Sequence, residues 1–165
     1  MSTPGYGYND GGAGPSSRTD YAANDQIFWT TYSGWGKTSS IGSITDGTSN
    51  TLFFGEKAMA QRAVTTGSWY WDEPFVMGGT GGTGRCGIEL YSDSQLNDFP
   101  ERASGAGWSV GGESCGGGNW GNPSSSGGPQ FAFGDGSVRS VRYGTPSAMV
   151  QRMIRAADGG VVNFD

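Results

Sequence analysis

Apolar and polar residues alternate most clearly between Gln130 and Ser140, where the sequence is QFAFGDGSVRS. Phe131 and Phe133 are separated by one small residue, and this period of two predicts a strand with one buried face. The dipeptide Asp135-Gly136 follows, and both of its residues tolerate a positive φ angle. The segment therefore predicts a β-hairpin with a two-residue turn.

The two-residue turn also predicts how the strands of this hairpin pair. Phe133 is expected opposite Val138, and Phe131 is expected opposite Ser140. The first strand then supplies most of the apolar face, because its phenylalanines face only a valine and a serine. An aspartate before glycine is a common turn residue, so the hairpin is predicted to be structural rather than catalytic.

The period changes from two to 3.6 after the hairpin, which predicts an amphipathic helix over about residues 146–157. Thr145 can cap this helix, and Pro146 suits its first position, where a missing N–H costs nothing. Gly159 offers a left-handed residue that can end it. The apolar side chains that share one face of this helix are Met149, Val150, Met153, Ile154 and Ala157.

A second apolar segment, Thr51–Glu56 (TLFFGE), is hydrophobic on both faces, as is typical of a central strand. Before it, Thr45 or Asp46 can cap a short helical turn across Gly47–Asn50, because short polar side chains satisfy local backbone N–H groups. Nearer the start of the chain, Gln26–Trp29 is predicted to form a short apolar strand.

Together these elements predict an α+β fold that is mainly β, with an antiparallel sheet, long glycine-rich loops and one C-terminal helix. Glycine supplies 32 of the 165 residues, well above the usual ~7%, which places much of the chain in loops and turns. Residues 1–17 are rich in Gly, Tyr, Pro and Ser and are predicted to form an extended arm. Residues 18–165 are predicted to form a single β-rich head domain.

The charge of the chain excludes several classes of partner. The formal net charge is −5, and the ten Lys and Arg residues are scattered rather than clustered. Nucleic-acid binding, which needs a basic patch, is therefore not expected. No signal peptide and no run of about 18 apolar residues is present in this sequence, so no membrane span is predicted in it.

Cys86 and Cys115 are the two cysteines of the chain, and 28 residues separate them. We interpret the pair as a disulfide of a secreted protein, which predicts an extracellular or cell-surface location. Two unpaired thiols in a cytosolic protein are the alternative. A zinc site is less favoured, since the chain has no histidine and no CxxC pair.

Several segments together resemble a known family. They are TDYAAN at Thr19–Asn24, ITDGTSNTLFFGE at Ile44–Glu56, FAFGDGSVRSV at Phe131–Val141, and AADGGVV at Ala156–Val162. In order and spacing they are similar to the C-terminal domain of unknown function of prepilin-like secreted proteins of planctomycetes, a domain that has also carried a solute-binding-protein label. The resemblance implies export through a type IV pilin-like leader, a hydrophobic N-terminal helix and a β-rich head on the cell surface.

The chain departs from that family pattern in three places. It opens on a Gly/Tyr arm instead of a leader and a long apolar helix. A His-Gly-Gly stretch that often precedes the hairpin is replaced by SSSGG at Ser124–Gly128, and Ser140 stands where an aromatic residue is usual. The loss of the histidine from this stretch removes any histidine-based metal or catalytic site.

The leading functional hypothesis is a pilin-like structural subunit that associates with copies of itself into a filament outside the cell. Low charge and many aromatic residues suit burial between subunits, and a head-to-tail contact that does not close gives a helical polymer. Tyr6 and Tyr8 alternate with glycines, so the arm can be ordered as a strand added to another surface. The alternative, for an isolated molecule, is an unstructured N-terminus. The predicted interface residues of the arm are Thr3, Tyr6, Tyr8 and Asn9.

The alternative hypothesis is a monomeric surface module that binds glycans or small solutes through tryptophan-bearing loops. Flat aromatic faces stack on sugars, and the candidate side chains are Trp35, Trp108 and Trp120. The competing interpretation is that the six tryptophans supply the core and the subunit interfaces, since the chain has few aliphatic residues.

Catalysis and metal binding receive less support from the sequence. The candidate acid/base carboxylates are Asp72-Glu73 and Asp93/Asp98. Asp72 and Glu73 are adjacent, and neighbouring residues of a strand point to opposite faces, so they do not form a facing pair. We therefore do not expect an enzyme. No cofactor is expected, although calcium could bind a group of oxygen ligands in one short segment. Its weak candidates are Asp93, Ser94, Asn97 and Asp98.

Overall fold

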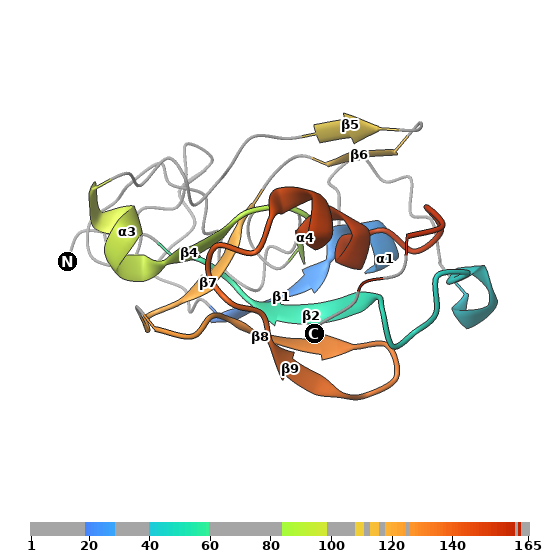
Figure 1. Ribbon diagram of the computed structural model, residues 1–165, viewed down its shortest axis with the longest axis horizontal. Helices are drawn as coiled ribbons and strands as arrows, with labels where there is room; N and C mark the ends of the chain where they lie inside the picture. Colours follow the sequence, from blue (N-terminus) through green and yellow to red (C-terminus); the bar gives the residue numbers. More distant parts are fainter. Residues whose placement is uncertain are drawn as a thin grey trace, which may run out of the picture.

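The computed structural model describes part of the chain (Figure 1). Its described residues are 19–28, 40–59, 84–98, 108–110, 113–115, 118–124, 126–160 and 162. The arm at residues 1–17 lies outside them, and so do Trp29, Trp35, Asp72 and Glu73. The side chains of Asn97, Asp98 and Trp108 are likewise outside the described part.

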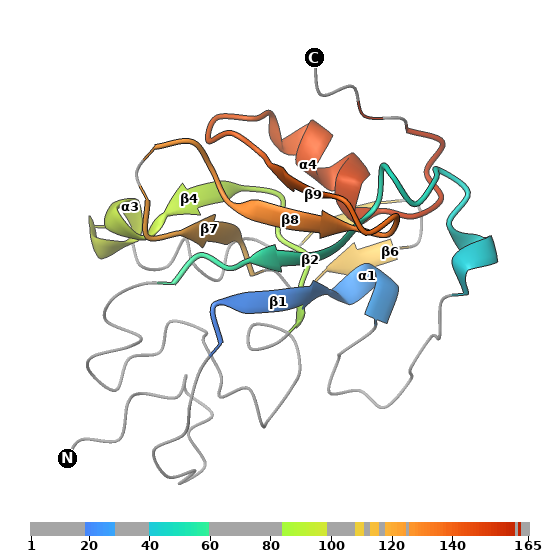
Figure 2. The ribbon, with the colours of Figure 1, turned by 90° about the horizontal axis from the view of Figure 1, so that it is seen from below.

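A five-stranded mixed sheet forms the centre of the molecule, in the order β3-β1-β2-β8-β9. Figure 2 shows β1, β2, β8 and β9 side by side. All neighbouring strands pair antiparallel except β1 and β3, which are parallel. The fold is mainly β, as the sequence predicts, although the sheet is mixed rather than purely antiparallel. The strands are β1 Tyr21–Asn24, β2 Leu52–Glu56, β3 Gly84–Arg85, β8 Gln130–Phe133 and β9 Val138–Ser140.

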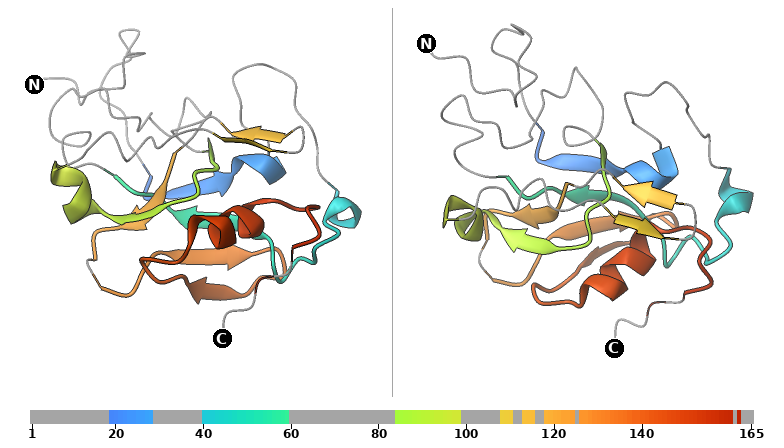
Figure 3. Two further views of the ribbon diagram at one scale, coloured as in Figure 1. Left: turned by 45° about the horizontal axis from the view of Figure 1, so that its top comes forward. Right: turned by 90° about the horizontal axis from the view of Figure 1, so that it is seen from above.

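Two smaller strand pairs and several short helices complete the described fold (Figure 3). One pair is parallel, with β4 Leu90–Ser92 beside β7 Trp120–Asn122, and the other is the antiparallel pair of β5 Trp108–Val110 and β6 Glu113–Cys115. The helices are α1 Asp25–Phe28, the 3-10 turn η1 Ile41–Ser43, α3 Asp93–Asp98 and α4 Ser147–Ile154.

The hydrophobic core lies between the sheet and α4, which packs over one face of it (Figures 1 and 3). Strand residues Leu52, Phe131 and Phe133 are at most 2% exposed, and Val150 and Ile154 of α4 are fully buried. The other members of the core cluster are Ala22, Cys86, Leu90, Cys115, Trp120, Val141, Met153 and Val162. Of the side chains predicted to form the apolar face of this helix, Val150, Met153 and Ile154 are buried and Met149 is partly buried. The fifth, Ala157, is exposed and lies beyond the end of α4, so its assignment to that face is wrong.

Two glycines permit close packing in this core. A Cβ atom at Gly55 of β2 would lie 2.4 Å from the Phe131 ring and 2.9 Å from the Trp120 ring. At Gly121 of β7 it would lie 1.7 Å from the backbone oxygen of Tyr91. A larger residue at either site would force its neighbours to move, because real Cβ atoms do not approach heavy atoms so closely.

The hairpin between β8 and β9 is present, but its predicted register is wrong by one residue. Ala132 lies opposite Val138, and Phe131 lies opposite Arg139. The loop has three residues, since the N–H of Phe133 donates to the oxygen of Ser137 and the N–H of Gly136 donates to the oxygen of Phe133. Gly136 takes a φ of +83°, which is typical of a turn closed by a left-handed glycine bulge.

The predicted strand Gln26–Trp29 is also wrong, because the strand lies earlier, at Tyr21–Asn24. Asn24 ends that strand: its side-chain oxygen accepts the N–H of Gln26 at 3.0 Å and turns the chain into α1. Its side-chain nitrogen donates to the backbone oxygens of Leu52 at 2.8 Å and Ile154 at 2.7 Å. One buried amide thus joins β1, β2 and α4.

Helix α4 is shorter than predicted at both ends. It begins at Ser147, so that Pro146 is the cap residue and not the first helical residue. The Thr145 hydroxyl donates to the backbone oxygen of Arg142 at 2.7 Å and makes no cap contact with the helix. Gly159 has the expected positive φ of +77°, but it lies in a loop beyond the end of the helix.

Candidate functional site

The residues of the family-like motifs meet at one end of the sheet, where Asp46 holds the loop after α4. The Asp46 carboxylate accepts the N–H of Asp158 at 2.7 Å and the N–H of Gly159 at 3.0 Å. The N–H of Asp46 donates to the oxygen of Ala156 at 3.2 Å. The prediction that Asp46 caps a local helical turn is wrong, since its side chain binds backbone 112 residues further along the chain.

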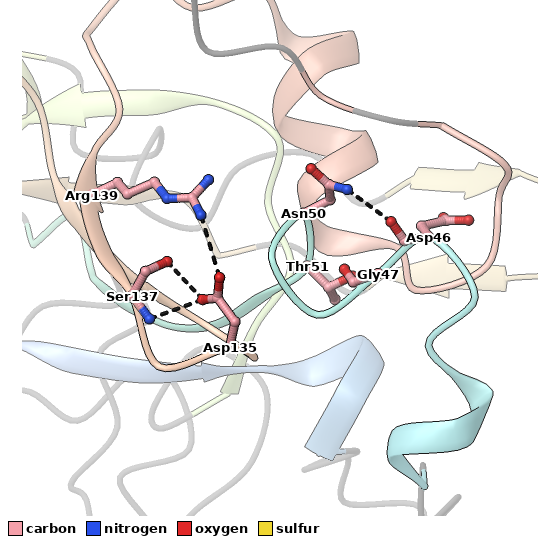
Figure 4. A network of polar contacts seen from close by, with 7 residues as sticks. All are labelled: Asp46, Gly47, Asn50, Thr51, Asp135, Ser137 and Arg139. Atoms are coloured by element: carbon pink, nitrogen blue, oxygen red, sulfur yellow. Dashed lines mark hydrogen bonds and ion pairs between the residues drawn. The ribbon is translucent and has the colours of Figure 1, made fainter.

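The turn that follows Asp46 is held by its own side chains (Figure 4). Asn50 donates from its side-chain nitrogen to the backbone oxygen of Asp46 at 2.9 Å, and the Thr51 hydroxyl donates to the oxygen of Gly47 at 3.1 Å. The backbone oxygen of Thr51 in turn accepts the N–H of Gly134 at 3.0 Å. The motif before β2 is therefore attached to the β8–β9 turn.

Asp135 occupies that turn and organises it (Figure 4). Its carboxylate accepts the Ser137 hydroxyl at 2.7 Å and the Ser137 N–H at 2.9 Å, and Arg139 lies 3.5 Å away. The hydrogen bonds from Ser137 lower the pKa of Asp135 below its ordinary value, with a smaller contribution from Arg139. Every acceptor contact serves the turn itself, so Asp135 is explained by structure.

A second polar group lies where β2, β7 and the segment after β9 meet. The Glu56 carboxylate accepts the side-chain N–H of Asn122 and the backbone N–H of Gln130, both at 2.8 Å. The Tyr143 hydroxyl donates to the side-chain oxygen of Asn122 at 2.8 Å. Burial raises the pKa of Tyr143, and the charges of Asp93 and Glu56 act in the same direction.

This group predicts an alkaline loss of stability that depends on Tyr143. Because the folded pKa of Tyr143 is raised above 10.0, its contribution to stability is complete below pH 10 and is lost as the pH rises through the folded value. At about pH 8, Tyr143→Phe is expected to lower the free energy of unfolding by about 1 kcal/mol through the lost hydrogen bond. The gap between the two proteins is expected to shrink above pH 10 in urea unfolding; a gap that stays constant contradicts this role.

The predicted disulfide is confirmed. Cys86 and Cys115 are bonded, with their Cα atoms 5.7 Å apart. The bond joins the end of β3 to β6. Beside it, Arg85 is fully buried and donates from Nη1 to the backbone oxygen of Ala58 at 2.8 Å and also to that of Asn119. The disulfide region is thus part of the folded core.

The glycan hypothesis loses one of its three tryptophans. Trp120 is fully buried, its indole N–H donates to the backbone oxygen of Gly87 at 2.8 Å, and its ring meets Phe131 edge-on at 5.6 Å. The ring of Trp120 therefore has no face to offer a sugar and belongs to the core. The side chains of Trp35 and Trp108 lie outside the described residues, so that part of the hypothesis stays a prediction.

The calcium candidates are only partly described. Asp93 begins α3, and its carboxylate accepts the N–H of Met59 at 3.0 Å. The Ser94 hydroxyl lies 2.9 Å from the Ser92 hydroxyl. Among the described residues, no group of three or more His, Cys, Asp or Glu side chains could hold a metal ion. Calcium binding by this segment stays a prediction.

Sequence reasoning missed an exposed apolar surface on the sheet face opposite α4. Register places Ala23, Phe54, Ala132 and Val138 in one row across four strands, and Tyr21 lies on the same face as Ala23. We define the outer-face patch as Tyr21, Phe28, Phe54 and Val138, which are 57%, 41%, 45% and 64% exposed.

The patch contains an ordered aromatic group. The Phe28 ring stacks on Phe54 with centroids 4.9 Å apart, and it meets Phe53 edge-on at 5.3 Å. A β-bulge between Leu52 and Phe54 interrupts the alternation of β2 and leaves both phenylalanines in reach of Phe28. The apolar run TLFF is the sequence feature that could have indicated this exposed patch. It predicts instead a strand that is buried on both faces.

The geometry defines a disulfide-linked, mainly β head in which the motif residues build the fold. A family model described as a protein of unknown function (DUF1559), SBP_bac_10, matches residues 1–147. The chain belongs to this family. No curated protein and no solved structure matches the chain. In the part of the chain that the structure describes, no helix is long and apolar enough to cross a membrane.

Proposed function

We propose that this chain is a secreted structural subunit that associates with copies of itself through the sheet face opposite α4. The outer-face patch is the observation that carries the proposal. Its four side chains are exposed although they are large and apolar, and they extend from β1 across to β9. Contiguous apolar surface of this kind is typical of protein–protein contacts.

Other features support a secreted assembly. The Cys86–Cys115 disulfide is typical of proteins that work in an oxidising compartment. The motif residues Asp46, Asn24 and Asp135 make hydrogen bonds within the fold, which is consistent with a structural role for the head. A filament of pilin-like heads is the form of assembly that the motif resemblance favours, with the arm residues Thr3, Tyr6, Tyr8 and Asn9 in the contact.

The proposal is tested by replacing the central residue of the patch. Phe54→Ser is expected to raise the dissociation constant for self-association by about tenfold or more, because a large apolar side chain no longer leaves water on contact. Sedimentation velocity over a wide range of protein concentration measures the change. Circular dichroism checks that the variant is folded.

Ile41→Ser is the matched control for this experiment. Ile41 is also apolar and is 73% exposed, but it lies on η1, outside the sheet. We expect it to assemble as the unaltered chain does. If Phe54→Ser and Ile41→Ser weaken self-association equally, the effect comes from exposed apolar surface in general. That result contradicts a specific contact through the outer-face patch. A monomer at every concentration contradicts the proposal, and a shift of its tryptophan fluorescence with a polysaccharide then favours glycan binding.

A further inference from the structure

Strand β9 is an edge of the five-stranded sheet, with β8 on its other side. The N–H of Phe133 donates to the oxygen of Ser137, and the N–H of Val141 donates to the oxygen of Pro129. These bonds fix the positions at which β9 is hydrogen-bonded to β8. Because backbone groups alternate in direction along an antiparallel strand, those of Val138 and Ser140 point away from β8. In the described part of the chain no strand pairs with the outer side of β9, so this edge presents backbone donors and acceptors to an additional strand.

The side chains beside this edge have a pattern that a further strand must match. Val138 is 64% exposed and continues the row formed by Phe54 and Ala132 on the outer face. A strand added at β9 would place every second side chain on that face. The sequence GYGYND at residues 5–10 supplies such a pattern, since Tyr6 and Tyr8 share one face and glycines lie on the other.

The charges near β9 and the length of the arm are consistent with pairing between the arm and this edge. Arg142 lies just after β9 and is exposed. Asp10 is the one charged side chain among residues 1–10, and it follows the two tyrosines. From Thr19, where the described chain begins, eleven residues lead back to Tyr8, an extended reach of about 36–40 Å. Neighbouring heads are within that distance for a domain of this size.

We propose that the edge of β9 accepts residues 3–9 of a second copy of this chain as a sixth strand, with Tyr6 and Tyr8 packed beside Val138 on the outer face. The inference rests on the proposed self-association and names its contact. Each copy then offers one donor segment and one acceptor edge, so the contact is head-to-tail and can repeat along a filament.

A proline at the edge tests the acceptor. Val138→Pro removes an N–H that points away from β8, so the hairpin keeps its own hydrogen bonds. We expect the full chain with Val138→Pro to associate at least about tenfold more weakly in sedimentation velocity. Val138→Thr is the control, since it keeps the N–H and a β-branched side chain, and it is expected to assemble. Equal assembly by folded Val138→Pro overturns the acceptor.

The donor is tested by the double variant Tyr6→Ser/Tyr8→Ser, which changes no described residue of the head. Alone, it is expected to associate as weakly as Val138→Pro. Mixed one to one, the two variants are expected to form dimers and nothing longer, because one has the working arm and the other has the working edge. Dimers in the mixture show that the arm of one copy binds the edge of another, because neither variant has both a working arm and a working edge.

The outcomes separate this contact from the proposed function. If the unaltered chain never associates, both fail. If it associates and Phe54→Ser weakens it, while Val138→Pro and the tyrosine double variant assemble normally, self-association stands and the strand contact is wrong. A mixture that stays monomeric, although each parent is folded, also overturns the strand contact.

Discussion

Replacing Cys86 and Cys115 together by alanine is expected to lower the free energy of unfolding by roughly 3–4 kcal/mol. The two cysteines are 29 positions apart, so the bond removes much of the freedom of the unfolded chain between them. Both side chains are buried, Cys86 completely, so the loss also reaches the core. Urea unfolding of the double variant beside the unaltered chain measures the difference.

The chemical control is the unaltered chain unfolded in the presence of a reducing agent. It is expected to resemble the double variant, because both lack the cross-link. A double variant that unfolds within about 1 kcal/mol of the oxidised chain contradicts a stabilising role for the bond. In that case the disulfide would indicate an oxidising compartment but would add little to the free energy of unfolding.

Asn24→Ala is expected to lower the free energy of unfolding by about 3 kcal/mol, which is a large loss for one side-chain amide. The change removes the donor to the backbone oxygens of Leu52 and Ile154 and the acceptor of the Gln26 N–H. Asn24 is fully buried, so the groups left behind cannot turn to water. Chemical denaturation at neutral pH measures the effect.

Asn24→Asp is the matched variant, because it has the same size and keeps the acceptor for Gln26. At neutral pH it is expected to be at least as unstable as Asn24→Ala, since a carboxylate oxygen then faces two carbonyl oxygens. A stable Asn24→Asp protein would show that the amide donor does not join the strands to α4. A small loss of stability in both variants would likewise contradict the claim that the Asn24 amide joins the strands to α4.

The sequence predicted the elements whose signals are local. The period of two at Phe131 and Phe133 gave β8, the apolar run TLFFGE gave β2, and the helical spacing around Val150 gave α4. The disulfide followed from the number of cysteines and their surroundings. Each of these signals depends on residues close together in the chain or on composition.

Features that depend on distant residues could not be predicted in the same way. Asp46 precedes glycine as many local caps do, and only the folded chain brings Asp158 and Gly159 to its carboxylate. The hairpin register depends on Gly136 taking the bulge position, which the dipeptide Asp135-Gly136 permits as readily as a two-residue turn. Phe54 and Val138 are placed in one row only by the register of four strands. The outer-face patch could therefore not be predicted from either segment alone.

The central claim is that copies of this head associate through the outer face and the edge of β9. Its most direct test is sedimentation velocity of the unaltered, oxidised chain over a wide concentration range. We expect the mean sedimentation coefficient to rise continuously with concentration, because a head-to-tail contact has no closed end state. A single sedimenting species of monomer size at every concentration would contradict the claim.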